Sequence, residues 1–87
     1  MTSFVLETFV PGGSRDHFTG DVAGLRRAAG TADAGGAVRH LGSYLVPGDE
    51  MAFHLVDASD IRDVERVAGE AGVEAERIVE AVTGGPE

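Results

Sequence analysis

The chain has 87 residues, of which 15 are acidic and 7 are basic, so its formal net charge is -8 at pH 7. This length leaves room for one domain with a single core, and the negative charge argues against nucleic acid and anionic membrane surfaces as partners. Because the sequence contains no cysteine, a disulfide framework, a thiolate metal site and an iron–sulfur cluster are excluded.

The N-terminal stretch lacks the pattern of a secretion signal. No basic residue precedes its apolar part, and Glu7 interrupts that part. No run approaches the roughly 20 apolar residues of a membrane span. We therefore expect a cytoplasmic protein without a membrane partner.

The first predicted elements are a strand and a helix. Phe4–Val10 is rich in β-branched and aromatic residues and ends at a Pro-Gly-Gly turn. Ser14 can cap the helix that follows. Its apolar face consists of Phe18, Val22, Leu25 and Ala29. A loop of small residues, Thr31–Gly36, then leads to the second strand.

A hairpin is predicted next, with strands over Ala37–Val46 and Glu50–Ala58 joined by a Pro-Gly-Asp turn. Ser59 or Asp60 can cap the second helix, and Gly72 is placed to end it in a left-handed conformation.

Arg77–Val82 is the last predicted strand. The single domain then spans residues 1–82, and residues 83–87 form a flexible tail.

The order strand–helix–strand–strand–helix–strand is the split βαβ arrangement of ferredoxin-like folds. Right-handed crossovers place the first and third strands at the centre of a four-stranded antiparallel sheet, with both helices on one face. The predicted fold is therefore an α+β ferredoxin-like sandwich. A large exposed apolar patch is rare on a monomer. We therefore expect a homodimer in which a second copy of the chain covers the open face, or else a metal ion or a small molecule bound there.

The register of the hairpin decides which side chains share that face. A turn at Gly48-Asp49 pairs Tyr44 with Phe53 and His40 with Asp57. The predicted open face then carries Val38, His40, Gly42, Tyr44, Met51, Phe53, Leu55 and Asp57. The predicted helix-facing set is Leu41, Ser43, Leu45, Ala52, His54, Val56 and Ala58. A slip of one residue would break this partition and bring His40 alongside His54.

The charged and titratable residues of these strands have different expected roles. His54 lies among small apolar residues, which predicts a neutral structural imidazole with one hydrogen-bond partner. His40 faces Asp57 with Tyr44 nearby, a grouping suited to metal ligation or proton transfer, or to an interfacial salt bridge. Glu7 lies within a predicted central strand and needs a partner, either a cation, a histidine or a metal.

Four stretches of the chain resemble one known family: "FVLETFVPGG", "VRHLGSYL", "FHLVDAS" and "AGVEAERIVEAV". It is a widespread bacterial family of small ferredoxin-like proteins of unassigned function, represented by a nickel-binding, nickel-responsive protein. The resemblance covers nearly all of Phe4–Val82, although no single motif is specific.

The resemblance implies a site for Ni²⁺ or another divalent transition metal. Glu7 matches a glutamate of the family's first strand, and Asp57 matches an acid of its third strand. Gly42 stands where the family often has histidine, so the site is either lost or moved by one pleat to His40. The implied ligands are His40, Glu7, Asp57 and Tyr44.

Three functions are compatible with these residues. A non-catalytic, dimeric metal-binding protein ranks first on the resemblance, and imidazole and carboxylate suit such metals; it needs no catalytic residue and no organic cofactor. The second is a small dimeric α+β barrel enzyme of isomerase or monooxygenase type, in which the open faces of two subunits enclose an apolar pocket and His40, held by Asp57, is the general base. A pocket of about 300 Å³ or more with His40 at its wall would favour this enzyme. The third is an interaction domain whose open face is only a dimer interface.

Overall fold

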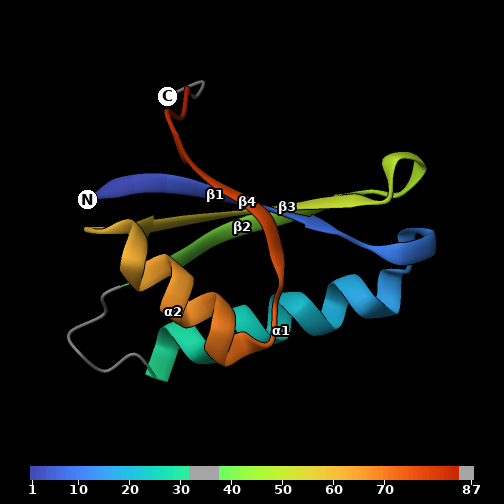
Figure 1. Ribbon diagram of the computed structural model, residues 1–87, viewed down its shortest axis with the longest axis horizontal. Helices are drawn as coiled ribbons and strands as arrows, with labels where there is room; N and C mark the ends of the chain where they lie inside the picture. The colour runs from blue at the N-terminus through green and yellow to red at the C-terminus, as the bar shows by residue number, and fades with distance from the viewer. Residues whose placement is uncertain (32–37, 85–87) are drawn as a thin grey trace.

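The computed structural model describes residues 1–31 and 38–84. Four antiparallel strands form one sheet in the order β2-β3-β1-β4 (Figure 1). The strands are β1 (Thr2–Phe9), β2 (Val38–Val46), β3 (Met51–Ala58) and β4 (Ala75–Ala81), and the helices are α1 (Arg15–Thr31) and α2 (Ile61–Ala71). The predicted ferredoxin-like α+β fold, with β1 and β3 in the centre, is confirmed.

Most of the predicted Thr31–Gly36 loop lies outside the described residues, as do residues 85–87 of the predicted tail. Thr31 itself belongs to α1 and is its last residue.

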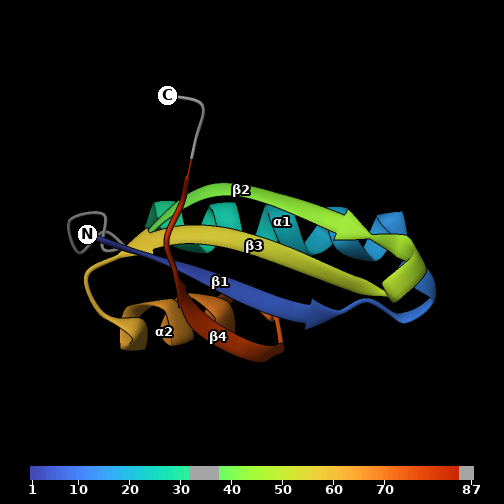
Figure 2. The ribbon, with the colours of Figure 1, turned by 90° about the horizontal axis from the view of Figure 1, so that it is seen from above.

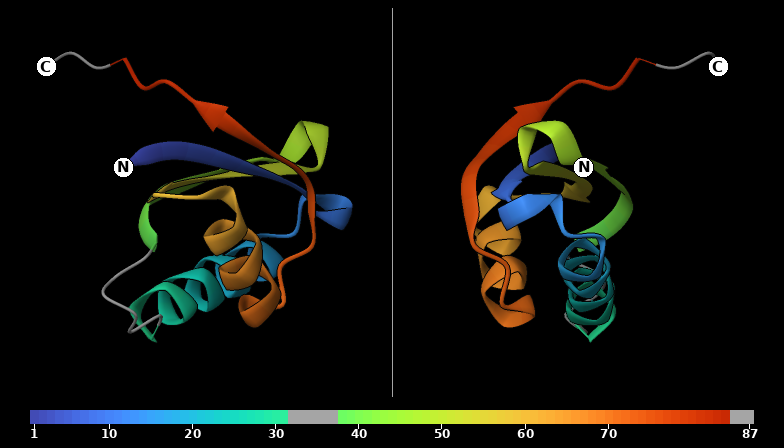
Figure 3. Two further views of the ribbon diagram at one scale, coloured as in Figure 1. Left: turned by 60° about the vertical axis from the view of Figure 1, so that its left-hand side comes forward. Right: turned by 90° about the vertical axis from the view of Figure 1, so that its right-hand side faces the viewer.

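Both helices lie on one face of the sheet (Figure 1). α1 runs under β2, whereas α2 lies nearer β4 (Figure 2). No described helix covers the opposite face (Figure 3), which we call the open face. Neither described helix has the length and apolar character needed to cross a membrane.

The core lies between the sheet and the two helices. Burial alternates along β1 and β3, as expected for strands with one covered face. The buried residues of β1 and β3 are Phe4, Leu6, Thr8, Ala52, His54, Val56 and Ala58. The helices add Leu25, Ala28 and Ala29 from α1 and Val64, Val67 and Ala68 from α2. The open face consequently presents the alternate residues of the same strands.

The predicted helix caps are confirmed. The Ser14 hydroxyl accepts a hydrogen bond from the backbone N–H of His17 at 3.1 Å, and the Asp60 carboxylate accepts one from the backbone N–H of Arg62 at 2.8 Å. Gly72 ends α2 at φ 73°. These caps fix where both helices begin and where α2 ends.

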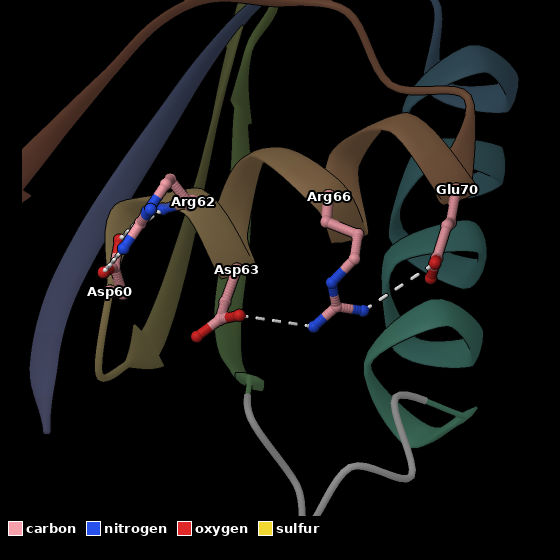
Figure 4. A network of polar contacts seen from close by, with 5 residues as sticks. All are labelled: Asp60, Arg62, Asp63, Arg66 and Glu70. Atoms are coloured by element: carbon pink, nitrogen blue, oxygen red, sulfur yellow. Dashed lines mark hydrogen bonds and ion pairs between the residues drawn. The ribbon is translucent and has the colours of Figure 1, made fainter.

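Ion pairs join the charged side chains along α2 (Figure 4). Arg62 pairs with Asp60 at 3.0 Å, and Arg66 reaches Asp63 at 3.5 Å and Glu70 at 3.7 Å. Such solvent-exposed pairs stabilise a fold little. They do mean that the positive charge of each of these arginines is compensated locally.

The hairpin register is as predicted only near its turn. Tyr44 pairs with Phe53 and Gly42 with Leu55, but beyond Gly42 the ladder shifts by one residue. His40 therefore pairs with Val56, and the prediction that His40 faces Asp57 is wrong.

The cause of the shift is a β-bulge at Leu41, the extra residue in β2 between His40 and Gly42. A bulge reverses the faces of all side chains on its far side. Val38 thereby enters the core, where it is 3% exposed, while Leu41 is 42% exposed. The predicted open-face positions of Val38 and His40 and the predicted inward position of Leu41 are corrected accordingly.

Candidate functional site

The bulge brings two histidines and a serine together on the helix-covered side of the hairpin. The His40 Nε2 atom lies 2.7 Å from the Ser43 Oγ atom, and that oxygen lies 2.7 Å from the His54 Nδ1 atom. We call these three residues the His–Ser–His chain. The one-residue shift at the bulge thus brings His40 alongside His54, as expected for a register slip.

Arg26 on α1 sets the direction of these hydrogen bonds. Its Nε–H donates to the Nδ1 atom of His40 over 3.5 Å, and a guanidinium can only donate. A neutral His40 therefore carries its proton on Nε2 and donates it to Ser43. The Ser43 hydroxyl then donates to Nδ1 of His54, which places the proton of His54 on Nε2.

His54 forms the buried end of the His–Ser–His chain. The residue is 0% exposed, and its ring stacks on Phe18 with centroids 5.9 Å apart. Its Nε2 atom has no hydrogen-bond partner among the described residues. Burial, and then the neighbouring His40, lower the pKa of His54 to about 4. This agrees with the predicted neutral imidazole that has one partner.

His40 forms the accessible end and is half-buried. Burial first, and then the positive charge of Arg26, lower the pKa of His40 below its usual value of 6.5. Both rings of the chain are therefore predominantly neutral at pH 7. A neutral imidazole is the form that can accept a proton.

His40 also borders a groove of about 510 Å³ beside the C-terminal half of α1 and the start of the edge strand β2. These two segments lie at the same end of the molecule (Figure 2). The lining residues are Arg26, Ala29, Gly30, Val38, Arg39, His40 and Leu41. The accessible end of the chain thus has space for a small molecule next to it.

The other predicted site residues lie on the open face, across the sheet from His40. Glu7 forms an ion pair with Arg77 at 3.1 Å, so its partner is a cation. The Asp57 carboxylate accepts a hydrogen bond from the Ser3 hydroxyl at 2.6 Å. Tyr44 is 64% exposed and packs against the ring of Phe53, with centroids 5.7 Å apart.

The residues that the family resemblance implies do not fit a metal site within one chain, because the sheet separates the imidazole of His40 from the carboxylates. In residues 1–31 and 38–84, no three His, Asp or Glu side chains are grouped so that they could hold a metal ion. Transition metals bound by imidazole and carboxylate ordinarily need at least three such ligands.

Sequence reasoning missed Ser43, His54 and Arg26 as neighbours of His40. The signal that pointed to them was Gly42, because a glycine inside a strand often marks a bulge. A bulge at this point of "VRHLGSYL" turns His40 to the side of Ser43.

Comparison with known proteins supports the fold. No family model matches the chain, and no curated protein matches it. Among solved structures, it is similar to the crystal structure of a protein from Streptomyces coelicolor, with 18% identical residues and a TM-score of 0.68. The match covers 95% of this chain and 99% of that chain. At this identity, the similarity shows the fold alone.

Proposed function

We propose that the protein is a small enzyme of isomerase type, in which His40 acts as general base and moves a proton on a bound carbon acid. The observation that carries this proposal is the hydrogen-bonded His–Ser–His chain at the wall of the groove. The groove has a volume of about 510 Å³ and is largely open to solvent.

In the proposed reaction, the long hydrogen bond from Arg26 Nε to His40 Nδ1, at 3.5 Å, opens when the substrate binds. The Nδ1 lone pair of His40 then accepts a proton from a carbon of the substrate. The C–H bond breaks, its electron pair stays on the substrate, and His40 becomes an imidazolium ion. The proton then returns from Nδ1 to a different carbon of the same molecule, which restores the neutral base. No oxidant, cofactor or metal ion enters this balance.

Ser43 and His54 act as positioning residues. Ser43 accepts the Nε2–H of His40 in both protonation states, which keeps the Nδ1 atom as the reacting one. Burial, and then the neighbouring His40, lower the pKa of His54 to about 4. His54 therefore does not take the proton itself. An imidazole held in one tautomer by a hydrogen-bonded partner is a recurring device in proton transfer.

Nickel binding receives less support from this arrangement. The predicted carboxylate ligands lie on the open face, and Arg26 beside the Nδ1 atom of His40 would repel a cation. The proposed reaction therefore uses the imidazole of His40 as a base and not as a ligand.

We propose in addition that a second copy of the chain covers the open face. Its apolar centre includes Val5, Met51, Phe53, Leu55 and Val79. Around it, the register places two acids and two arginines, Glu7, Asp57, Arg39 and Arg77. A face with balanced charges lets two copies approach although each chain carries a net charge of -8.

Deuterium exchange into small carbon acids tests the catalytic proposal. The protein is incubated in D₂O with a panel of ketones, keto acids and lactones, and the loss of C–H signals is followed by proton NMR. We expect enzyme-dependent exchange for at least one compound and a loss of at least 100-fold in His40→Gln, in line with the usual contribution of a general base.

His17→Gln is the matched control, because His17 is an exposed histidine of α1 paired with Asp21 and lies outside the groove. It should retain the wild-type exchange rate. Exchange that is absent with every compound, or that persists unchanged in His40→Gln, rules out His40 as the base.

A further inference from the structure

Arg26 differs in its surroundings from the arginines that form ion pairs. Arg62, Arg66 and Arg77 each lie within 4 Å of a carboxylate, at 3.0, 3.5 and 3.1 Å. Arg26 has no carboxylate partner among the described residues, and its recorded contact is the imidazole of His40. Within residues 1–31 and 38–84, its positive charge is therefore not compensated by an ion pair, whereas the whole chain has a net charge of -8.

The groove beside Arg26 is positively charged along its described lining. Arg26 and the imidazole of His40 border it, Arg39 borders it from the strand position that pairs with Asp57, and none of the described lining residues is acidic. The remaining lining residues are apolar or glycine. This local charge, opposite in sign to that of the whole chain, favours an anionic ligand.

We infer that the groove binds a small carboxylate, and that Arg26 holds this carboxylate while the reacting carbon of the same molecule lies at the Nδ1 atom of His40. The inference rests on the proposed function for the identity of the reacting carbon. When the substrate binds, the guanidinium of Arg26 gives up its 3.5 Å hydrogen bond to His40, and its donors can form the paired hydrogen bonds that suit a carboxylate.

The distance between the two groups fits a single small substrate. The Arg26 Nε atom lies 3.5 Å from His40 Nδ1 in the structure, so a carboxylate that draws the guanidinium away from this atom lies only a few bonds from a carbon that His40 can reach. The bound negative charge also offsets the positive charge of Arg26. His40 therefore becomes a stronger base when the substrate is present.

Benzoate and benzamide are suitable probes, because they share a shape and differ in charge. Backbone amide resonances of β2 in the full chain are followed by NMR as each probe is added. We expect saturable shifts with benzoate and none with benzamide. Arg26→Gln should weaken benzoate binding at least 10-fold, whereas Arg62→Gln, which alters an ion-paired arginine of α2 (Figure 4), should leave it unchanged.

The pKa of His40 provides a second measure of the same contact. In the wild type, saturating benzoate should raise the pKa of His40, and in Arg26→Gln benzoate should leave it unmoved. Equal binding of benzoate and benzamide, or unchanged benzoate binding in Arg26→Gln, overturns the inference. Inorganic phosphate that binds while benzoate does not overturns it as well.

His40→Gln separates this inference from the proposed function. The variant should still bind benzoate, because Arg26 remains, while it loses deuterium exchange. Benzoate binding without exchange in the wild type would uphold the anion site and reject the base. Deuterium exchange in a protein that binds benzoate and benzamide equally would uphold His40 as the base and reject the anion site.

Discussion

His54 is a titratable side chain that the fold keeps in its neutral form. It is 0% exposed, and burial, followed by His40, lowers its pKa from 6.5 to about 4. Between these two values, the unfolded state binds more protons than the folded state. The stability that neutral His54 provides is therefore present in full above pH 6.5 and is lost as the pH falls toward 4.

We expect the free energy of unfolding to fall by on the order of 2 to 3 kcal/mol over that interval through His54 alone. His54→Leu should lose most of this dependence, because the titrating group is gone. Urea denaturation at a series of pH values measures it, and His17→Leu, at an exposed position, should keep the wild-type slope. If the free energy of unfolding of His54→Leu depends on pH as steeply as that of the wild type, other titratable groups cause the dependence.

At the scale of single elements, the bulge in β2 brings the residues of the His–Ser–His chain together. Without it, His40 would share the open face with Tyr44, and Val38 would leave the core. The shifted register buries Val38 and leaves Leu41 42% exposed, and burying either side chain stabilises a fold by about 1.5 to 3 kcal/mol. The choice between them rests on the packing of the core, and the His–Ser–His chain follows from it.

The two turns at the far end of the sheet are joined by a close backbone contact. Gly13 has φ 63°, and a Cβ atom there would lie 2.8 Å from the carbonyl oxygen of Pro47. Gly13→Ala should therefore destabilise the protein by about 1 to 3 kcal/mol.

Gly20→Ala is the matched substitution within α1. A Cβ atom at Gly20 meets nothing within 4 Å, and alanine favours a helix over glycine by about 0.5 to 1 kcal/mol. Thermal unfolding should show opposite changes in Tm for the two variants. A Tm for Gly13→Ala at or above that of the wild type would contradict the close contact.

Much of the fold could be predicted because local signals agree with one another. The Asp60 cap, the left-handed Gly72 and the alternation along β3 each fix a boundary or a face. The sheet order then follows from the handedness of crossovers. These signals are local, and tertiary packing does not oppose them.

The site could be predicted less fully than the fold. The prediction paired the residues of the two hairpin strands one by one outward from the turn and assumed that the pairing has no interruption. That assumption is valid from Val46 to Gly42 and fails at Leu41. The displacement depends on whether Val38 or Leu41 enters the core, which is a property of tertiary packing. Residues such as Arg26, which is remote from the hairpin in sequence, could be placed beside His40 only by the fold.

At the scale of the whole molecule, the open face leaves large side chains in solvent. Phe9 is 49% exposed and Tyr44 is 64% exposed, in a chain short enough for burial at an interface to matter. We expect a dimer at micromolar concentration in analytical ultracentrifugation. Phe53→Glu should produce a folded monomer, since it places a charge at the centre of the proposed interface.

Ala23→Glu tests the specificity of that effect, because Ala23 is an exposed residue of α1 on the other side of the molecule. This variant should remain dimeric. A monomeric wild type, or a Phe53→Glu protein that stays dimeric, would place the interface elsewhere.

The tautomer of His40 distinguishes a general base from a structural imidazole most directly. Two-bond ¹H–¹⁵N spectra of the labelled protein at about pH 7.5 report the protonation of each ring nitrogen. We expect His40 to be neutral, with its proton on Nε2 and an unprotonated Nδ1 that accepts the 3.5 Å hydrogen bond from Arg26, and Arg26→Ala to convert it to a mixture of tautomers. A His40 ring that is charged at this pH, or that carries its proton on Nδ1, would contradict its role as the base.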